Sequence, residues 1–478
     1  MKKVMLIYPP GSKFQRGEDR CQANVEASTS TSVRACNDLG YCSSELKMRG
    51  HDTFLRDYQT EGLNIDELFS DFNEFNPDVV FISTTNGTIF EDIETINILK
   101  EKKPEILFIL KGALFFDIKK DELKKLELVN VDVIIGGEAE FIIADLIDSY
   151  FANKNLKNIP GIYFKDKKWN KTDFTVFEKN LDKLSFPDRE QMKNELYVRP
   201  DTGEPMATIS TSRGCPASCI YCLTPIISGK NIRRRSPENI VDELRECVHK
   251  YGINNFFFKS DTFTMDKDWV QNVCNKIINS DIHGKIEWVA NSRTKPLGRE
   301  TLEVMKEAGC WMIAFGLESG SSLTLQKIKK NTSIEDNKRA VSLAKELGFK
   351  TFGFYMIGFP WEHSKHLSLT KNHMFELNTD FVELHLAIPY YGTSLYEFAK
   401  EEGLINQATF GKDYFSAPVI PTKYLSRNYI EKFRKKTLRR YHLRPEYVFD
   451  RFKEVITDPG KMKGYLKYGY RLMKNCFI

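Results

Sequence analysis

Three cysteines stand close together in the middle of the chain, at Cys215, Cys219 and Cys222. Their spacing is C-x3-C-x2-C, and Gly214 and Pro216 bend the chain around the first of them into a loop. Thiolates hold iron–sulfur clusters, and a four-iron cluster takes one thiolate per iron. Because only three thiolates are offered, the spacing predicts a [4Fe-4S] cluster with one iron open to a ligand that is not protein.

Two other kinds of site use clustered cysteines. A structural zinc site takes four ligands, usually as two pairs, and the sequence has no second Cys or His pair at partner distance. A disulfide with a spare thiol needs an oxidising compartment, but no secretory signal is recognisable, since the apolar N-terminal run stops at Pro9-Pro10. The sequence contains no run of about 20 apolar residues, so no segment is expected to span a membrane. The open cluster is favoured, and a cytoplasmic location is expected.

From Ser212 to Cys222 the chain resembles the radical S-adenosylmethionine (radical SAM) superfamily, and the resemblance includes the aromatic Tyr221 before the third cysteine. It implies that SAM binds the open iron through its amino and carboxylate groups, with Tyr221 in the SAM site. One electron from the cluster then cleaves SAM and releases a 5′-deoxyadenosyl radical. The family's chemistry implies an electron donor such as flavodoxin or ferredoxin.

Six strand-like segments are expected to position this loop. The first is 206–210, directly before the cysteines, and helix-length segments separate the others: 255–259, 286–290, 312–317, 351–357 and 381–388. Six βα units are too few for a closed eight-stranded barrel. They predict an open partial (β/α)6 TIM-type barrel over residues 203–400, with its site at the carboxyl ends of the strands. The radical SAM resemblance covers this region and implies the same fold.

Polar residues follow several of these strands. A charged residue that leaves a buried strand is costly unless it meets a ligand or an ion-pair partner, so each residue has both interpretations. By resemblance, Asp261 stands where the family contacts the SAM amino group, and Ser292 and Arg293 face the carboxylate and ribose. Glu318 faces the ribose hydroxyls, and the segment 353–362 contacts the adenine. No catalytic residue is assigned.

Residues 1–150 alternate continuous apolar strands with helices, which predicts a Rossmann-like parallel sheet covered on both faces. Ligands bind such sheets at the carboxyl ends of the strands. In front of a radical SAM core this arrangement resembles the cobalamin-binding domain of the B12-dependent radical SAM family, and Gly-Gly-Glu-Ala-Glu at 136–140 resembles that family's Gly-Glu turn. The resemblance implies these cobalamin contacts: Pro10, Ser83, Thr84, Gly112, Gly137 and Glu138.

One motif of many other B12 proteins is missing. The sequence has no Asp-x-His-x-x-Gly, the element that supplies a histidine below the cobalt. No histidine is therefore expected at that position. A domain that has lost its cofactor stays an alternative.

The remaining parts are a linker at 151–202 and a helical C-terminal region at 401–478. The net charge of the chain is +5, but residues 421–478 hold 16 Lys or Arg and 5 Asp or Glu, which leaves −6 for the rest. The favoured interpretation of the first tail helix, 426–441, is a cap over the barrel with a solvated basic face. The alternative is peripheral contact with the inner membrane surface or a lipid-linked substrate. Nucleic acid is not expected, because no recognised motif is present.

Together these features predict a cobalamin-dependent radical SAM enzyme, most simply a methyltransferase that acts on an unactivated carbon of a small-molecule or lipid-linked substrate. One alternative is a radical cyclase or rearrangement enzyme of the magnesium-protoporphyrin ester cyclase type. Another is a non-catalytic iron–sulfur or cobalamin sensor, which would not need to hold SAM. The sequence does not name the substrate.

Overall fold

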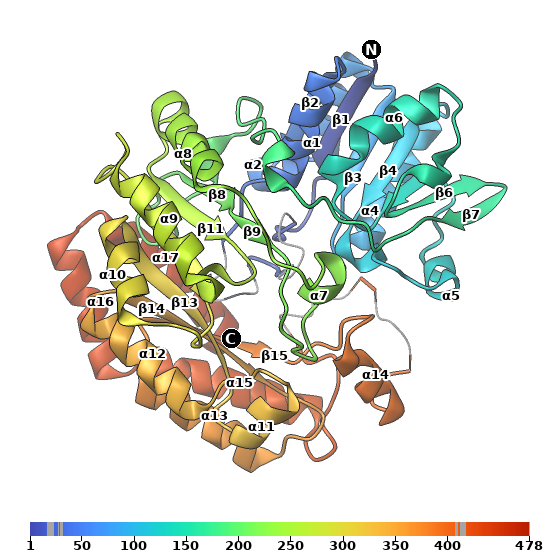
Figure 1. The fold of residues 1–478 in the computed structure, drawn as a ribbon. Helices are drawn as coiled ribbons and strands as arrows, with labels where there is room; N and C mark the ends of the chain where they lie inside the picture. Colours follow the sequence, from blue (N-terminus) through green and yellow to red (C-terminus); the bar gives the residue numbers. More distant parts are fainter. Residues whose placement is uncertain (17–22, 27, 29–31, 407–409, 412–416, 478) are drawn as a thin grey trace.

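The computed structural model describes residues 1–16, 23–26, 28, 32–406, 410–411 and 417–477. An N-terminal sheet domain lies beside a second, barrel-like sheet, and three helices at the end of the chain pack against the barrel (Figure 1). No helix in the described ranges is long and apolar enough to cross a membrane.

The N-terminal sheet has the strand order β2-β1-β3-β4-β5-β6-β7. The first five strands pair in parallel and the last two pair antiparallel, as a hairpin added to β5. This hairpin falls in the expected linker, so the first sheet extends past residue 150. The strands are β1 (Lys3–Tyr8), β2 (Asp52–Asp57), β3 (Val79–Ser83), β4 (Leu107–Lys111), β5 (Val133–Ile135), β6 (Ile162–Asp166) and β7 (Lys168–Lys171).

Both faces of this sheet are covered, as the continuous apolar strands predict. One apolar cluster joins alternate strand residues to α1 and α6, and the other joins the opposite set to α2, α3 and α4. A capping box at Asn64 and Glu67 fixes the start of α3. The helices are α1 (Asn37–Met48), α2 (Tyr58–Glu61), α3 (Ile65–Phe75), α4 (Ile89–Lys102), α5 (Lys120–Leu123) and α6 (Ile143–Phe151).

The second sheet has six strands, all parallel, in the order β15-β14-β13-β12-β11-β8. Because β15 and β8 are both edges, the barrel is open, and the predicted partial barrel is confirmed. The strands are β8 (Met206–Ser210), β11 (Asn255–Lys259), β12 (Glu287–Ser292), β13 (Cys310–Glu318), β14 (Lys350–Ile357) and β15 (Phe381–Leu386).

Helices cover the outer face of this sheet. Ser236 caps the first of these helices: its hydroxyl accepts a hydrogen bond from the backbone N–H of Asn239, and Pro237 opens α8. The helices are α8 (Pro237–Tyr251), α9 (Lys267–Ile278), α10 (Arg299–Glu307), α11 (Ser322–Lys327), α12 (Ile334–Glu346), α13 (Ser364–Leu377) and α14 (Ser394–Glu401).

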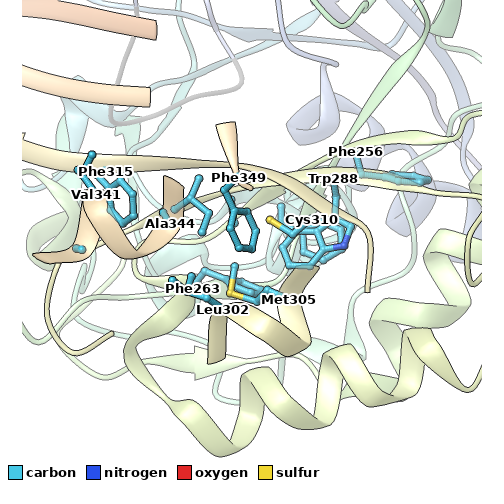
Figure 2. Packing of buried hydrophobic residues seen from close by; sticks show 14 of the residues in the cluster. Phe256, Phe263, Trp288, Leu302, Met305, Cys310, Phe315, Val341, Ala344 and Phe349 are labelled. Carbon is cyan, nitrogen blue, oxygen red and sulfur yellow. The ribbon is translucent and has the colours of Figure 1, made fainter. Parts of the chain in front are cut away.

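The core of the barrel domain lies between its strands and these helices. Figure 2 shows Trp288 and Phe315, from β12 and β13, facing Met305 of α10 and Ala344 of α12. The Trp288 ring stacks on Phe258, with 4.3 Å between ring centroids. Buried and half-buried residues alternate along β14, so every second side chain faces the inside of the barrel. The core therefore fixes which strand residues are available to a site.

Three helices end the chain: α15 (Arg427–His442), α16 (Pro445–Thr457) and α17 (Lys461–Phe477). In α15, Ile430, Leu438 and Tyr441 are buried in the barrel core. The first tail helix is therefore a cap on the barrel, the favoured interpretation of its sequence.

Candidate functional site

The three cysteines belong to a loop that opens at β9 (Ser212–Arg213), which pairs antiparallel with β10 (Arg233–Arg234). Gly214 has a φ of 90°, and a Cβ there would lie 2.1 Å from the carbonyl oxygen of Asn231. Only glycine fits this turn. The loop ends in the short helix α7 (Thr224–Ile227), and Figure 1 places β9 and α7 between the two sheets.

One pocket, with about 670 Å³ of empty space, is lined by all three cysteines. Three strand-end residues predicted for SAM also line it, together with Tyr221 from the loop. Thus seven of the eight residues predicted for the cluster and SAM share one pocket. They are Cys215, Cys219, Tyr221, Cys222, Asp261, Ser292 and Arg293.

Arg293 lies directly beside the cysteines. Its Nη1 is 3.9 Å from the Sγ of Cys219, and its Nη2 donates a hydrogen bond to the carbonyl oxygen of Lys330. The neighbouring Ser292 hydroxyl lies 2.6 Å from the hydroxyl of Thr264. The guanidinium therefore places a positive charge beside one of the three sulfurs. Three thiolates beside one arginine fit a [4Fe-4S] cluster.

Asp261 ties the end of β11 to the cysteine loop. Its Oδ2 accepts a hydrogen bond from the backbone N–H of Gly214 at 2.7 Å, and its Oδ1 accepts one from the Thr224 hydroxyl at 3.3 Å. These two contacts lie on either side of the cysteines along the chain. Asp261 therefore positions the loop, and its predicted contact with the SAM amino group stays a prediction.

Glu318, the eighth predicted residue, does not line the pocket itself, but it pairs with Lys330, which does. The Nζ of Lys330, which lines the pocket, lies 2.6 Å from the Oε1 of Glu318, and both side chains are buried. Glu318 has a φ of 60° at a register shift in β13. Burial, followed by the charge of Glu318, raises the pKa of Tyr221 well above its ordinary value. The phenol is therefore neutral beside the carboxylate.

Lys330 is a site residue that the sequence did not reveal. It follows α11, and its neighbours Lys329 and Asn331 have φ angles of 55° and 56°. A non-glycine residue in this region costs on the order of 1–3 kcal/mol, and such strain is concentrated at functional sites. The two strained residues direct Lys330 into the pocket.

A buried carboxyl group, that of Glu362, stabilises the turn in the segment 353–362, which is predicted to contact adenine. Glu362 accepts hydrogen bonds from the backbone N–H groups of Gly358 and Phe359 and from the Thr324 hydroxyl. Burial raises the pKa of Glu362 to about 7 in spite of these donors. Glu362 therefore holds the turn at the end of β14 together and does not project into the pocket.

A second cleft, with about 930 Å³ of empty space, separates the carboxyl edge of the N-terminal sheet from the barrel. Most of its lining residues are polar or charged, among them Asp38, Lys111 and Arg213. Asp261 lines this cleft as well as the cysteine pocket. The two spaces therefore adjoin at one carboxylate.

Of the six residues predicted for cobalamin, Gly137 and Glu138 line the second cleft. A Cβ at Gly137 would come no nearer than 4.0 Å to another group, the Cα of Gly161, so this glycine borders open space. A Cβ at Gly112 would lie 2.9 Å from Thr84, so those two residues pack on each other. A large planar ligand needs open surface that a side chain would otherwise fill. Because Gly137 has no side chain, it leaves such surface free.

The other predicted residues do not line this cleft. Ser83 and Thr84 are fully buried, and their hydroxyls donate to the carboxylates of Asp38 and Asp92 at 2.7 and 2.5 Å. Pro10 also lies outside the lining. Their contact with cobalamin stays a prediction.

Glu138 joins the two domains. Its carboxylate pairs with Arg233 at 2.6 Å and with Arg213 at 3.1 Å, and Arg213 directly precedes the cysteine loop. Burial alone would raise the pKa of Glu138, but the two guanidinium groups lower it below the ordinary value. A charged Glu138 therefore fixes the carboxyl edge of the N-terminal sheet against the cysteine loop.

Comparison with known proteins gives one family match, to the Radical SAM superfamily, over residues 209–368. A protein named "uncharacterized methyltransferase PH0819", from Pyrococcus horikoshii, is 29% identical over 98% of this chain and 99% of its own length. The anaerobic magnesium-protoporphyrin IX monomethyl ester cyclase of Cereibacter sphaeroides is 24% identical over 90% of this chain and 71% of its own.

Among solved structures, the chain is similar to the radical SAM methyltransferase TsrM from Kitasatospora setae, with tryptophan and a SAM analogue bound. The TM-score is 0.67 at 17% identity, covering 85% of this chain and 78% of that one. A TsrM structure with cobalamin and a [4Fe-4S] cluster bound gives a TM-score of 0.65 at 16% identity. These likenesses extend over both sheets, so this order of domains is the same as in a solved protein.

Proposed function

The chain carries a radical SAM domain, and on that basis we propose that it is a cobalamin-dependent methyltransferase that methylates an unactivated carbon of a small molecule. The observation that carries the proposal is the junction of the two spaces at Asp261. A methyl donor in the second cleft and a radical source in the cysteine pocket would then face the same substrate. The relative from Pyrococcus horikoshii, whose printed name is that of a methyltransferase, supports this choice.

Different residues would act in the cysteine pocket and in the second cleft. Cys215, Cys219 and Cys222 would hold the [4Fe-4S] cluster, and Arg293 keeps a positive charge beside them. When bound, the cluster and SAM supply hydrogen-atom abstraction, and cobalamin supplies a transferable methyl group. Gly137 would leave room for the cobalamin, which the polar walls of the second cleft would orient. Glu138 keeps the two spaces in register by pairing with Arg213 and Arg233.

Lys330 gives a test of the SAM site that does not depend on turnover. Replacing it with methionine removes the cation 2.6 Å from Glu318 and leaves that carboxylate buried without its partner. We expect SAM to bind about tenfold more weakly, a loss of about 1.4 kcal/mol. The change would appear in anaerobic equilibrium dialysis and in the electron paramagnetic resonance spectrum of the SAM-bound cluster.

Lys330→Arg is the matched control for this variant, because it keeps a positive charge next to Glu318. It should restore most of the affinity. Unchanged SAM affinity in Lys330→Met would show that Lys330 and Glu318 form only a structural ion pair.

A radical cyclase is the second candidate, supported by the match to the cyclase of Cereibacter sphaeroides over 90% of this chain. The two reactions differ in product mass, since methylation adds one CH2 group and cyclisation does not. We expect label to pass from SAM with a deuterated methyl group into a small molecule of a cell extract under reducing, anaerobic conditions. Consumption of a molecule with no label gained would favour the cyclase.

The electron donor would be a flavodoxin or ferredoxin, which can deliver single electrons to the cluster. A sensor that binds the cluster and cobalamin without using them would leave SAM uncleaved. Cleavage of SAM on reduction therefore separates the enzyme from the sensor.

A further inference from the structure

The end of the chain leaves a large apolar surface uncovered. Helices α16 and α17 each carry four large apolar side chains that are at least half exposed, between 50% and 70% of their area. On α17 these residues recur every three or four positions, and on α16 they do so from Phe449 on, with Val448 one turn before Phe452, so each set lies along one side of its helix. They are Val448, Phe449, Phe452 and Ile456 on α16, and Met462, Leu466, Tyr470 and Met473 on α17. We call this set the tail face.

The opposite sides of both helices are fixed to the barrel. Tyr447 of α16 and Leu472 of α17 belong to the barrel core, and Arg451 pairs with Glu454 and Asp380. A Cβ at Gly464 would lie 2.2 Å from the carbonyl oxygen of Asp201, so α17 meets the segment before β8 backbone to backbone. The tail face therefore points away from the barrel, and Figure 1 shows α16 at the outer edge of the molecule. Exposed apolar surface of this extent marks an interaction site.

Positive charge in the tail face is concentrated on α17, since α16 contains three acidic and two basic residues. Helix α17 contains five basic residues and no acidic one: Lys461, Lys463, Lys467, Arg471 and Lys474. Burial, together with the charges of Arg471, Lys13 and Lys463, lowers the pKa of Lys467 below its ordinary value. Neighbouring cations therefore act on Lys467, and α17 itself contains no carboxylate.

This combination limits the partner. A second copy of the chain would bring the five cations of one α17 against those of another, and lysine is depleted at the core of protein interfaces. An anionic bilayer offers both complements: acyl chains for the apolar stripe and phosphate groups for the lysines. Amphipathic helices of this type lie in the interface with the apolar side about 5–10 Å deep.

We propose that the tail face docks the enzyme on a membrane surface that contains anionic lipid. The contact is made by α16 and α17. Helix α15, for which the sequence left membrane contact as an alternative, instead packs on the barrel as a cap. No residue of α16 or α17 lines either cleft, so the proposal goes beyond the reaction and does not depend on it. A membrane-bound enzyme would reach substrates that are themselves lipids or carried by lipids.

The test is cosedimentation of the full-length, cluster-loaded protein with vesicles. We expect binding to vesicles of equal parts phosphatidylglycerol and phosphatidylcholine, weakening as salt rises, and little binding to phosphatidylcholine alone. The double substitution Phe452→Glu and Leu466→Glu should lower the bound fraction about tenfold, since two charges would enter the acyl region. Lys463→Glu with Lys474→Glu should reduce binding to the anionic vesicles in the same way.

Val129→Glu is the matched control, because Val129 is as exposed as the tail-face residues but lies in the N-terminal domain. It should bind vesicles like the unchanged protein. Equal sedimentation of the Phe452/Leu466 variant, or no binding by the unchanged protein, would overturn the proposal. So would light scattering that shows a dimer which the same variant converts to monomer. None of these readouts requires SAM cleavage, so their failure is separate from failure of the proposed reaction.

Discussion

Replacing Cys215 with alanine is expected to remove the iron–sulfur cluster and to abolish cleavage of SAM. Cys215 lines the pocket with Cys219 and Cys222, and a cluster with one open iron has no ligand to spare. Iron content after anaerobic reconstitution should fall from about four atoms per chain to near zero, and 5′-deoxyadenosine should no longer form. Iron analysis and chromatography of the products measure both.

Cys274→Ala is the control for this variant. Cys274 is a fully buried thiol of α9 in the core of the barrel domain, away from the pocket. The control should lose some thermal stability because it leaves a small cavity, but it should keep the cluster. A Cys215→Ala protein with full iron content and active SAM cleavage would contradict the assignment of the cysteines.

Gly137→Leu is expected to prevent cobalamin binding while the fold and the cluster remain. A Cβ at this position meets no atom closer than 4.0 Å, so the side chain can be accommodated by the fold. It would, however, fill part of the cleft at the carboxyl edge of the N-terminal sheet. We expect hydroxocobalamin to bind at least about tenfold more weakly, as measured by its absorption after gel filtration.

The neighbouring glycine explains why this position is the better probe. A Cβ at Gly136 would lie 2.7–2.8 Å from Phe174 and the backbone of Phe115, so a larger residue there would disturb the fold itself. Gly298→Leu, at a position with no atom within 4 Å, is a suitable control. Cobalamin retained by Gly137→Leu at normal affinity would place the cofactor elsewhere.

Much of the site could be predicted because its residues follow local patterns. The cysteine spacing is read within one loop, and Asp261, Ser292 and Arg293 stand at the ends of strands whose apolar runs are unmistakable. In parallel sheets those ends meet at one edge, so the residues were expected to gather, and they do.

Lys330 could not be found in this way. It comes from a turn after α11 and pairs with Glu318. The pairing depends on left-handed backbone at Glu318, Lys329 and Asn331, and no sequence periodicity predicts that conformation. Packing across the sequence also decides the N-terminal site. Ser83 and Thr84 occupy the expected strand end, but their hydroxyl groups donate hydrogen bonds to Asp38 and Asp92, which lie on two different helices. Such pairings depend on tertiary structure, which the strand pattern alone does not specify.

The most direct test of the proposed reaction is anaerobic reconstitution with iron, sulfide and hydroxocobalamin, followed by reduction in the presence of SAM. The proposal predicts a bound corrin spectrum and two nucleoside products, 5′-deoxyadenosine from hydrogen abstraction and S-adenosylhomocysteine from methyl donation. 5′-Deoxyadenosine alone, with no corrin retained, would contradict it and leave a radical SAM enzyme that does not use cobalamin.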